Sequence, residues 1–172
     1  MLKERNKKMY YITITLFVVY LLFLVWVILF KLEFSLNELE RIRAYNFIPF
    51  HYEDGHNVRF HFSEVTNNVL IFIPVGIYLS LFFKKVPLWG KASLIFAVSL
   101  VLECSQYILA VGRFDITDII TNTIGGLLGM GIYIISCALF RNKEKAEQAM
   151  AILVNIITVS LVGVVFLLSS MN

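Results

Sequence analysis

Charged residues are scarce in this chain of 172 residues. Asp, Glu, Lys and Arg together make up 16% of it, against roughly 25% in a typical soluble domain. Hydrophobic residues reach 59%, and the mean hydropathy is +0.78. A soluble domain of this size has too small an interior to bury so much apolar surface. The composition therefore excludes an ordinary soluble protein and predicts an integral membrane protein.

Cysteine is also scarce, and basic residues form no dense patch. The two cysteines, Cys104 and Cys137, lie on different predicted spans. Their depths differ by roughly 20 Å at 1.5 Å per helical residue, which is beyond the reach of a disulfide. The net charge is only +3, and the basic residues are spread over short loops. These features argue against a disulfide-stabilised fold and against nucleic acid as a partner.

The sequence contains five long apolar runs. Each run is close to the roughly 20 residues that an α-helix needs to cross a bilayer, and none shows the alternation of a β-barrel strand. The first run exceeds the apolar core of a signal peptide, so we expect it to be retained. The sequence predicts an all-α integral membrane protein, a single domain over residues 1–172, with five transmembrane helices. The spans are residues 10–30, 65–83, 88–110, 118–140 and 150–168.

Charge predicts the orientation of these spans. With the N-terminus inside, ten of the fifteen basic residues fall on the inner side, as the positive-inside rule requires. The C-terminus and one larger loop, residues 31–64, then lie outside. Within that loop, Ser35 and Glu38 fit a capping box, so we expect a short surface helix that ends before Pro49.

Antiparallel threading brings polar side chains from three spans to the same outer depth. Glu103 is the sharpest case, because an intramembrane carboxylate normally faces the bundle interior and a partner. The residues of this predicted polar pocket share helical spacings of three and four. They are Glu64, Asn67, Asn68, Glu103, Gln106, Tyr107, Asp115, Asp118 and Asn122.

Proline and glycine mark the same region. Pro74 is expected to kink the second span. Gly125 and Gly129 have the GxxxG spacing that allows close helix approach, either within the chain or in a homo-oligomer.

Purely structural interpretations remain open for the individual residues. Asp118 fits an N-cap, Asn122 fits an interhelical hydrogen bond, and Arg113 fits a counter-ion for the carboxylates. Asn155, in the fifth span, stands apart from the predicted polar pocket and is expected to serve packing. The coincidence of depth across three helices is what favours a functional site.

Three ordered motifs resemble those of the VanZ-like membrane proteins. "NVLIFIPVG" matches an N-x-x-x-F-x-P-x-G signature at Asn68, Phe72, Pro74 and Gly76. "NFIPF", with Asn46 and Pro49, is similar to the N-L-I-P-F stretch of their external loop. The third motif combines E-x-x-Q, a basic residue with two aspartates, and N-x-x-G-G. It falls on Glu103, Gln106, Arg113, Asp115, Asp118, Asn122, Gly125 and Gly126.

The resemblance, over residues 46–140, implies a multi-pass protein of the bacterial cytoplasmic membrane that reduces susceptibility to teicoplanin. This lipoglycopeptide acts at the external face, and the family supplies no settled catalytic mechanism. In the first hypothesis, the protein is not an enzyme and binds a lipid-like or lipoglycopeptide ligand. Arg113 and Arg59 would attract an anionic headgroup, and the carboxylates would bind its polar groups.

Two other classes fit the same residues. A membrane-embedded hydrolase or transferase would use Glu103 and Asp118 as an acid/base pair, although no G-x-S-x-G or H-E-x-x-H motif is present. A small transporter ranks last, because the inner halves of the spans look almost purely apolar. No cofactor is expected. His51, His56, His61 and Glu64 are zinc-capable, but their spacing matches no zinc signature, so solvated histidines are favoured over a metal site.

Overall fold

The computed structural model describes residues 2–30, 42–50, 62–140 and 142–170 of the chain. Its five helices are all long and apolar enough to cross a membrane, so the predicted multi-pass membrane fold is confirmed at that level. The helices are α1 (Leu2–Phe30), α2 (Phe62–Phe82), α3 (Leu88–Leu109), α4 (Ile116–Leu139) and α5 (Lys143–Ser170).

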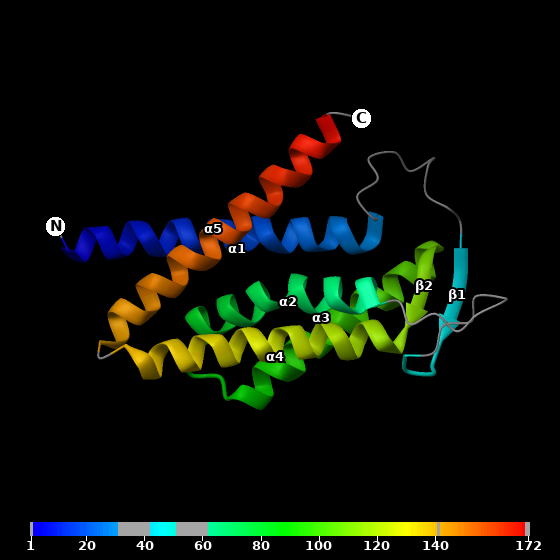
Figure 1. The fold of residues 1–172 in the computed structure, drawn as a ribbon, viewed down its shortest axis with the longest axis horizontal. Coiled ribbons are helices and arrows are strands. Elements are labelled where there is room, and N and C mark those ends of the chain that lie inside the picture. The colour runs from blue at the N-terminus through cyan, green and yellow to red at the C-terminus, as the bar shows by residue number, and fades with distance from the viewer. Residues whose placement is uncertain (1, 31–41, 51–61, 141, 171–172) are drawn as a thin grey trace.

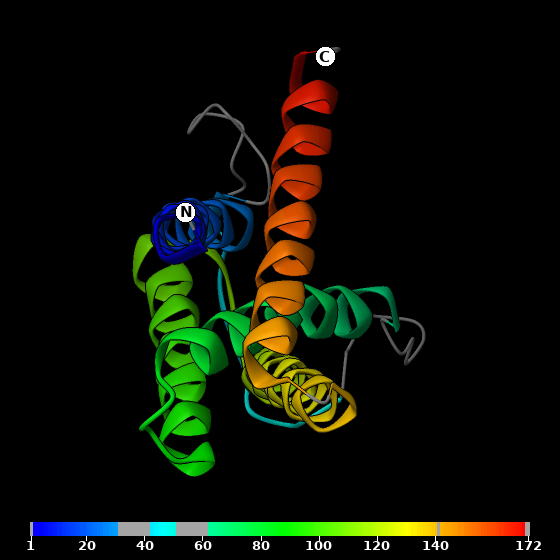
Figure 2. The same cartoon turned by 90° about the vertical axis from the view of Figure 1, so that its left-hand side faces the viewer.

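The helices gather their ends into two groups (Figure 1). One end of the bundle holds the N-terminus of α1 together with the turn from α2 to α3 and the turn from α4 to α5. We call it the N-terminal end. The opposite end carries the two strands described next, and we call it the strand end (Figure 1). The fifth helix runs obliquely to α1 and α4 in Figure 1, and Figure 2, which views α1 and α4 nearly end-on, shows α5 lengthwise.

Two short strands form a small parallel sheet beside the five predicted helices. Strand β1 (Ile42–Asn46) pairs with β2 (Val111–Asp115), in a register that sets Asn46 opposite Asp115. The helix expected from Ser35 onward does not include residues 42–46, because pairing with a distant partner overrides weak local helix propensity. Residues 35–41 lie outside the described part of the chain. The sheet joins residues 42–46, which precede α2 in the chain, to the segment between α3 and α4.

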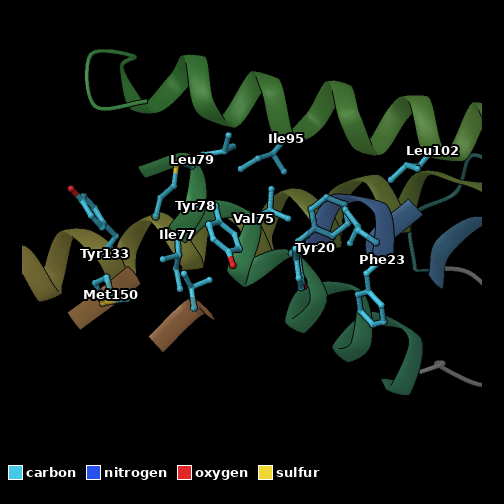
Figure 3. Close-up of a cluster of buried hydrophobic side chains, with 14 of the residues drawn as sticks. Tyr20, Phe23, Val75, Ile77, Tyr78, Leu79, Ile95, Leu102, Tyr133 and Met150 are labelled. Carbon is cyan, nitrogen blue, oxygen red and sulfur yellow. The ribbon is translucent and has the colours of Figure 1, made fainter. Parts of the chain in front are cut away.

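The apolar core draws large side chains from every helix. Figure 3 shows Tyr20, Tyr78, Ile95, Tyr133 and Met150, which come from α1 to α5 in that order. All five are buried. The rings of Tyr20 and Tyr78 lie 6.1 Å apart in a tilted arrangement, within the range of favourable aromatic pairs. The core therefore ties all five helices into one bundle.

Glycines allow α2 and α4 to pack with their backbones in contact. A Cβ atom added at Gly125 would collide with the carbonyl oxygen of Val69, and one at Gly129 with that of Ile73. In the reverse direction, a Cβ at Gly76 would collide with the carbonyl oxygen of Gly126. The GxxxG pair therefore serves a contact inside the chain. Pro74 lies buried in α2 beside this contact.

Candidate functional site

Two carboxylates are buried together at the strand end. Glu103, on α3, is 1% exposed, and its Oε2 accepts the backbone N–H of Asp115 at 2.9 Å. Asp115, 4% exposed, is the N-cap of α4 and accepts the N–H of Thr117 at 2.8 Å. Capping by Asp satisfies an amide that the first helical turn leaves free. The N-cap is thus Asp115, and the alternative of Asp118 in that role is wrong.

The parallel sheet adds a third partner to this pair. Because Asn46 stands opposite Asp115 in the sheet, its Nδ2 donates to Asp115 Oδ2 at 3.1 Å. Asn46 Oδ1 accepts the N–H of Ile48 at 3.1 Å, which turns the chain at the "NFIPF" motif. Phe50 then donates its N–H to Thr117 Oγ1 at 3.0 Å. The NFIPF motif is therefore hydrogen-bonded to α4 at two points, the N-cap Asp115 and Thr117 in the first turn.

Asp118 connects α4 to α2. Its Oδ1 accepts Asn68 Nδ2 at 2.7 Å. Asp118 lies within electrostatic reach of Glu103, Asp115, Glu64 and Arg113, and Arg113 is exposed on β2. The structure thus brings the three predicted carboxylates together, with an arginine at their edge. Their chemical role stays a prediction.

Two predicted amides lie beside the cluster with one polar atom each unpaired. Asn122 Nδ2 donates to Ser99 Oγ at 2.9 Å, and Gln106 Nε2 donates to the carbonyl of Ile28 at 2.8 Å. Asn122 Oδ1 and Gln106 Oε1 are buried and have no hydrogen-bond partner within the described residues. Buried polar atoms are satisfied in the great majority of cases, and Ser80 Oγ, near the other end of α2, is the third such exception among the described residues.

Some residues of this end were not predicted. Arg43, on β1, donates to the carbonyl of Ile108 at 3.2 Å and lies 5.7 Å from the ring centroid of Tyr107. Exposed apolar side chains follow it along the loop. Only knowledge of the strand pairing would have placed Arg43 here. Thr117 was also not predicted. Its position between Asp115 and Asp118 in the sequence was the feature that could have indicated it.

Part of the predicted site cannot be placed. Arg59, His51, His56 and His61 lie outside the described residues, while Glu64 is exposed in the first turn of α2. Among the residues that are described, no three His, Cys, Asp or Glu side chains are grouped closely enough to hold a metal ion.

A second buried polar network lies deeper in the bundle and corrects the expectation of apolar inner halves. Asn155 on α5 donates to Thr13 Oγ1 on α1 at 3.0 Å and accepts from Tyr78 on α2 at 3.4 Å. Tyr78 also shares a hydrogen bond of 2.8 Å with Thr158. The expected packing role of Asn155 agrees with these three interhelical contacts.

Two comparisons with known proteins give significant matches to this chain. A family model described as VanZ/LLP1 matches residues 17–141, which include every motif residue and end before α5. The chain is also 36% identical to "Protein VanZ" from Enterococcus faecium over 135 residues, which cover 77% of this chain and 80% of that protein. No solved structure gives a significant match.

Proposed function

Because the chain belongs to the VanZ/LLP1 family, we propose that it reduces bacterial susceptibility to teicoplanin-type lipoglycopeptides. It does so by binding an amphipathic component of the cell envelope at the strand end. The observation that carries this proposal is the burial of Glu103 and Asp115 beside Asp118. Removing a carboxylate from water costs free energy unless the group is paired or hydrogen-bonded, and an intramembrane carboxylate is by default a candidate functional residue.

Orientation supports an encounter with an external ligand. The positive-inside rule places the N-terminal end in the cytoplasm of a bacterial cell and the strand end at the outer face of its membrane. Teicoplanin-type agents act at that face. The cluster would therefore meet the agent, or its lipid-linked target, without transport.

The chemistry of the strand end suits an amphiphile. Carboxyl oxygens accept hydrogen bonds from hydroxyl and ammonium groups, and the oxygens of Gln106 and Asn122 that have no partner within the described residues add two acceptors. Arg113 would contact an anionic group. Tyr45, Phe47 and Ile48 are 60–66% exposed beside the cluster, and these side chains would cover the apolar part of the ligand.

A second candidate function is a hydrolase or transferase acting on a lipid-linked substrate. Its support is unequal burial: Glu103 is 1% exposed, whereas Asp118 is only partly buried, and unequal environments separate an acid from a base. Product formation by the purified protein, abolished in Glu103→Gln, would favour this candidate. A small transporter has less support, because the polar atoms of the network around Asn155 are already paired with one another.

The decisive experiment compares teicoplanin susceptibility of a sensitive Gram-positive host that expresses wild type, Glu103→Gln or Asp118→Asn at matched membrane levels. Vancomycin, which has no lipid tail, tests selectivity. Ser105→Ala is the matched control, since Ser105 lies two residues from Glu103 and donates only to its own helix at 2.7 Å. We expect wild type and Ser105→Ala to protect and the two carboxylate variants to lose protection. Full protection by both carboxylate variants would refute the site, and no protection by wild type would refute the function.

A further inference from the structure

A cavity of about 380 Å³ opens at the N-terminal end, far from the strand end. It lies between α1, the end of α2 and the start of α5, and Thr13 is among the residues that line it. Its volume falls within the usual range of small-ligand pockets, about 300–1,000 Å³. None of the three sequence motifs contributes to it.

The lining of the cavity carries charges of both signs. Lys84 Nζ lies 2.7 Å from Glu147 Oε2, and Glu147 Oε1 accepts the hydroxyl of Tyr133 at 3.3 Å. Both oxygens of Glu147 are therefore occupied. The ammonium of Lys84, half exposed, has three N–H donors and uses one of them on Glu147. Glu144 is an exposed carboxylate on the same lining, in the first turn of α5.

Apolar side chains make up much of the remaining lining of the cavity. The rings of Tyr10 and Phe82 meet edge to face with centroids 5.7 Å apart, and Leu81 and Ala151 line the wall beside them. The hydroxyl of Thr13 donates to the carbonyl of Met9 at 2.8 Å and accepts from Asn155. Because that hydroxyl is already satisfied, we expect the charged groups of a ligand to contact Lys84 and Glu144 instead.

We infer that this cavity binds a phospholipid whose headgroup carries a primary ammonium beside its phosphodiester. Glu144 accepts hydrogen bonds from the ammonium, Lys84 donates to the phosphate, and the acyl chains lie against Phe82 and Leu81. A lipid fits better than a water-soluble zwitterion because the cavity lies at the end of five membrane-length helices, where headgroups meet acyl chains. The two charges also set the selectivity: a quaternary ammonium offers no N–H to Glu144, and a purely anionic headgroup offers it no cation.

The test is native mass spectrometry of the full chain with equimolar phosphatidylethanolamine, phosphatidylcholine and phosphatidylglycerol of identical acyl chains. We expect phosphatidylethanolamine to be retained several-fold over the other two. Glu144→Gln, on an exposed helix start, should remove that preference without changing the melting temperature. Lys84→Gln should weaken retention, whereas Lys85→Gln, its exposed neighbour outside the lining, should not.

Two results would overturn the inference. Equal retention of the three lipids by wild type would show that no headgroup is selected. A preference that persists in Glu144→Gln would place selection elsewhere. Soluble glycerophosphoethanolamine supplies a third arm: if it displaces the lipid at equal concentration, the cavity recognises a free headgroup and the lipid assignment is wrong. None of these outcomes depends on teicoplanin or on the strand end.

Discussion

The strand end and the network around Asn155 are both buried and polar, yet they differ in the polar groups that they bury and in how those groups are hydrogen-bonded. The network uses neutral groups, and its Tyr, Thr and Asn side chains are bonded to one another across three helices. The strand end instead concentrates three carboxylates and leaves two amide oxygens without partners in the described part of the chain. A neutral, paired network is what helix packing in a membrane requires.

The same comparison shows that burying carboxyl groups at the strand end lowers the stability of the fold. A buried carboxyl group costs more free energy to remove from water than a buried hydroxyl does, and packing alone would be served better by apolar side chains. Glu103 and Asp115 are nevertheless held by backbone amides, a cap and a cross-strand amide. Hydrogen bonds that fix the position of buried carboxyl groups in this way are typical of a preorganised binding site.

The largest expected effect comes from the α2–α4 contact, on which both regions depend. Gly129→Val should collide with the backbone at Ile73 and destabilise the protein by about 3 kcal/mol or more, because neither backbone can retreat. Thermal unfolding in detergent measures this. Gly131→Val is the matched control, since a Cβ there meets no atom within 4 Å. Equal destabilisation by both variants would show that the close contact is unimportant.

Much of this architecture follows from sequence because the relevant physics is local. Run length specifies a membrane-spanning helix, and antiparallel threading with a fixed rise per residue places Glu103 and Asp118 at one depth. A close approach of another helix to Gly125 and Gly129 was likewise expected from the GxxxG spacing, but the sequence did not identify α2 as the partner.

The remaining features depend on partners far away in the sequence. Asn46 reaches Asp115 only because β1 pairs with β2 across 69 residues, and the isolated segment has no signal for that register. The network around Asn155 was missed for a related reason. Its partners Thr13 and Tyr78 lie on other helices, and each looks like an ordinary residue of an apolar run.

The next largest effect separates the two asparagines at the start of α2. Asn68→Ala removes the hydrogen bond of 2.7 Å to Asp118 and leaves that carboxylate less constrained. Protection against teicoplanin should fall clearly but less than in Glu103→Gln, and the free energy of unfolding should fall by about 1–2 kcal/mol. Asn67→Ala, on the exposed neighbour, should match wild type in both measurements. Loss of protection in both variants would mean that the start of α2, and not the bond to Asp118, is what matters.

The smallest effect should come from the network itself, and it tests whether burial or charge marks the functional end. Asn155→Ala removes hydrogen bonds to Thr13 and Tyr78 and should destabilise the protein by about 1 kcal/mol, the usual scale for a polar contact between membrane helices. Protection against teicoplanin at matched expression should not change. Ser160→Ala, on an exposed position of the same helix, controls for loss of a polar group. A loss of protection in Asn155→Ala at unchanged stability would join the two regions into one functional path, because a group used only for packing acts on function only through folding.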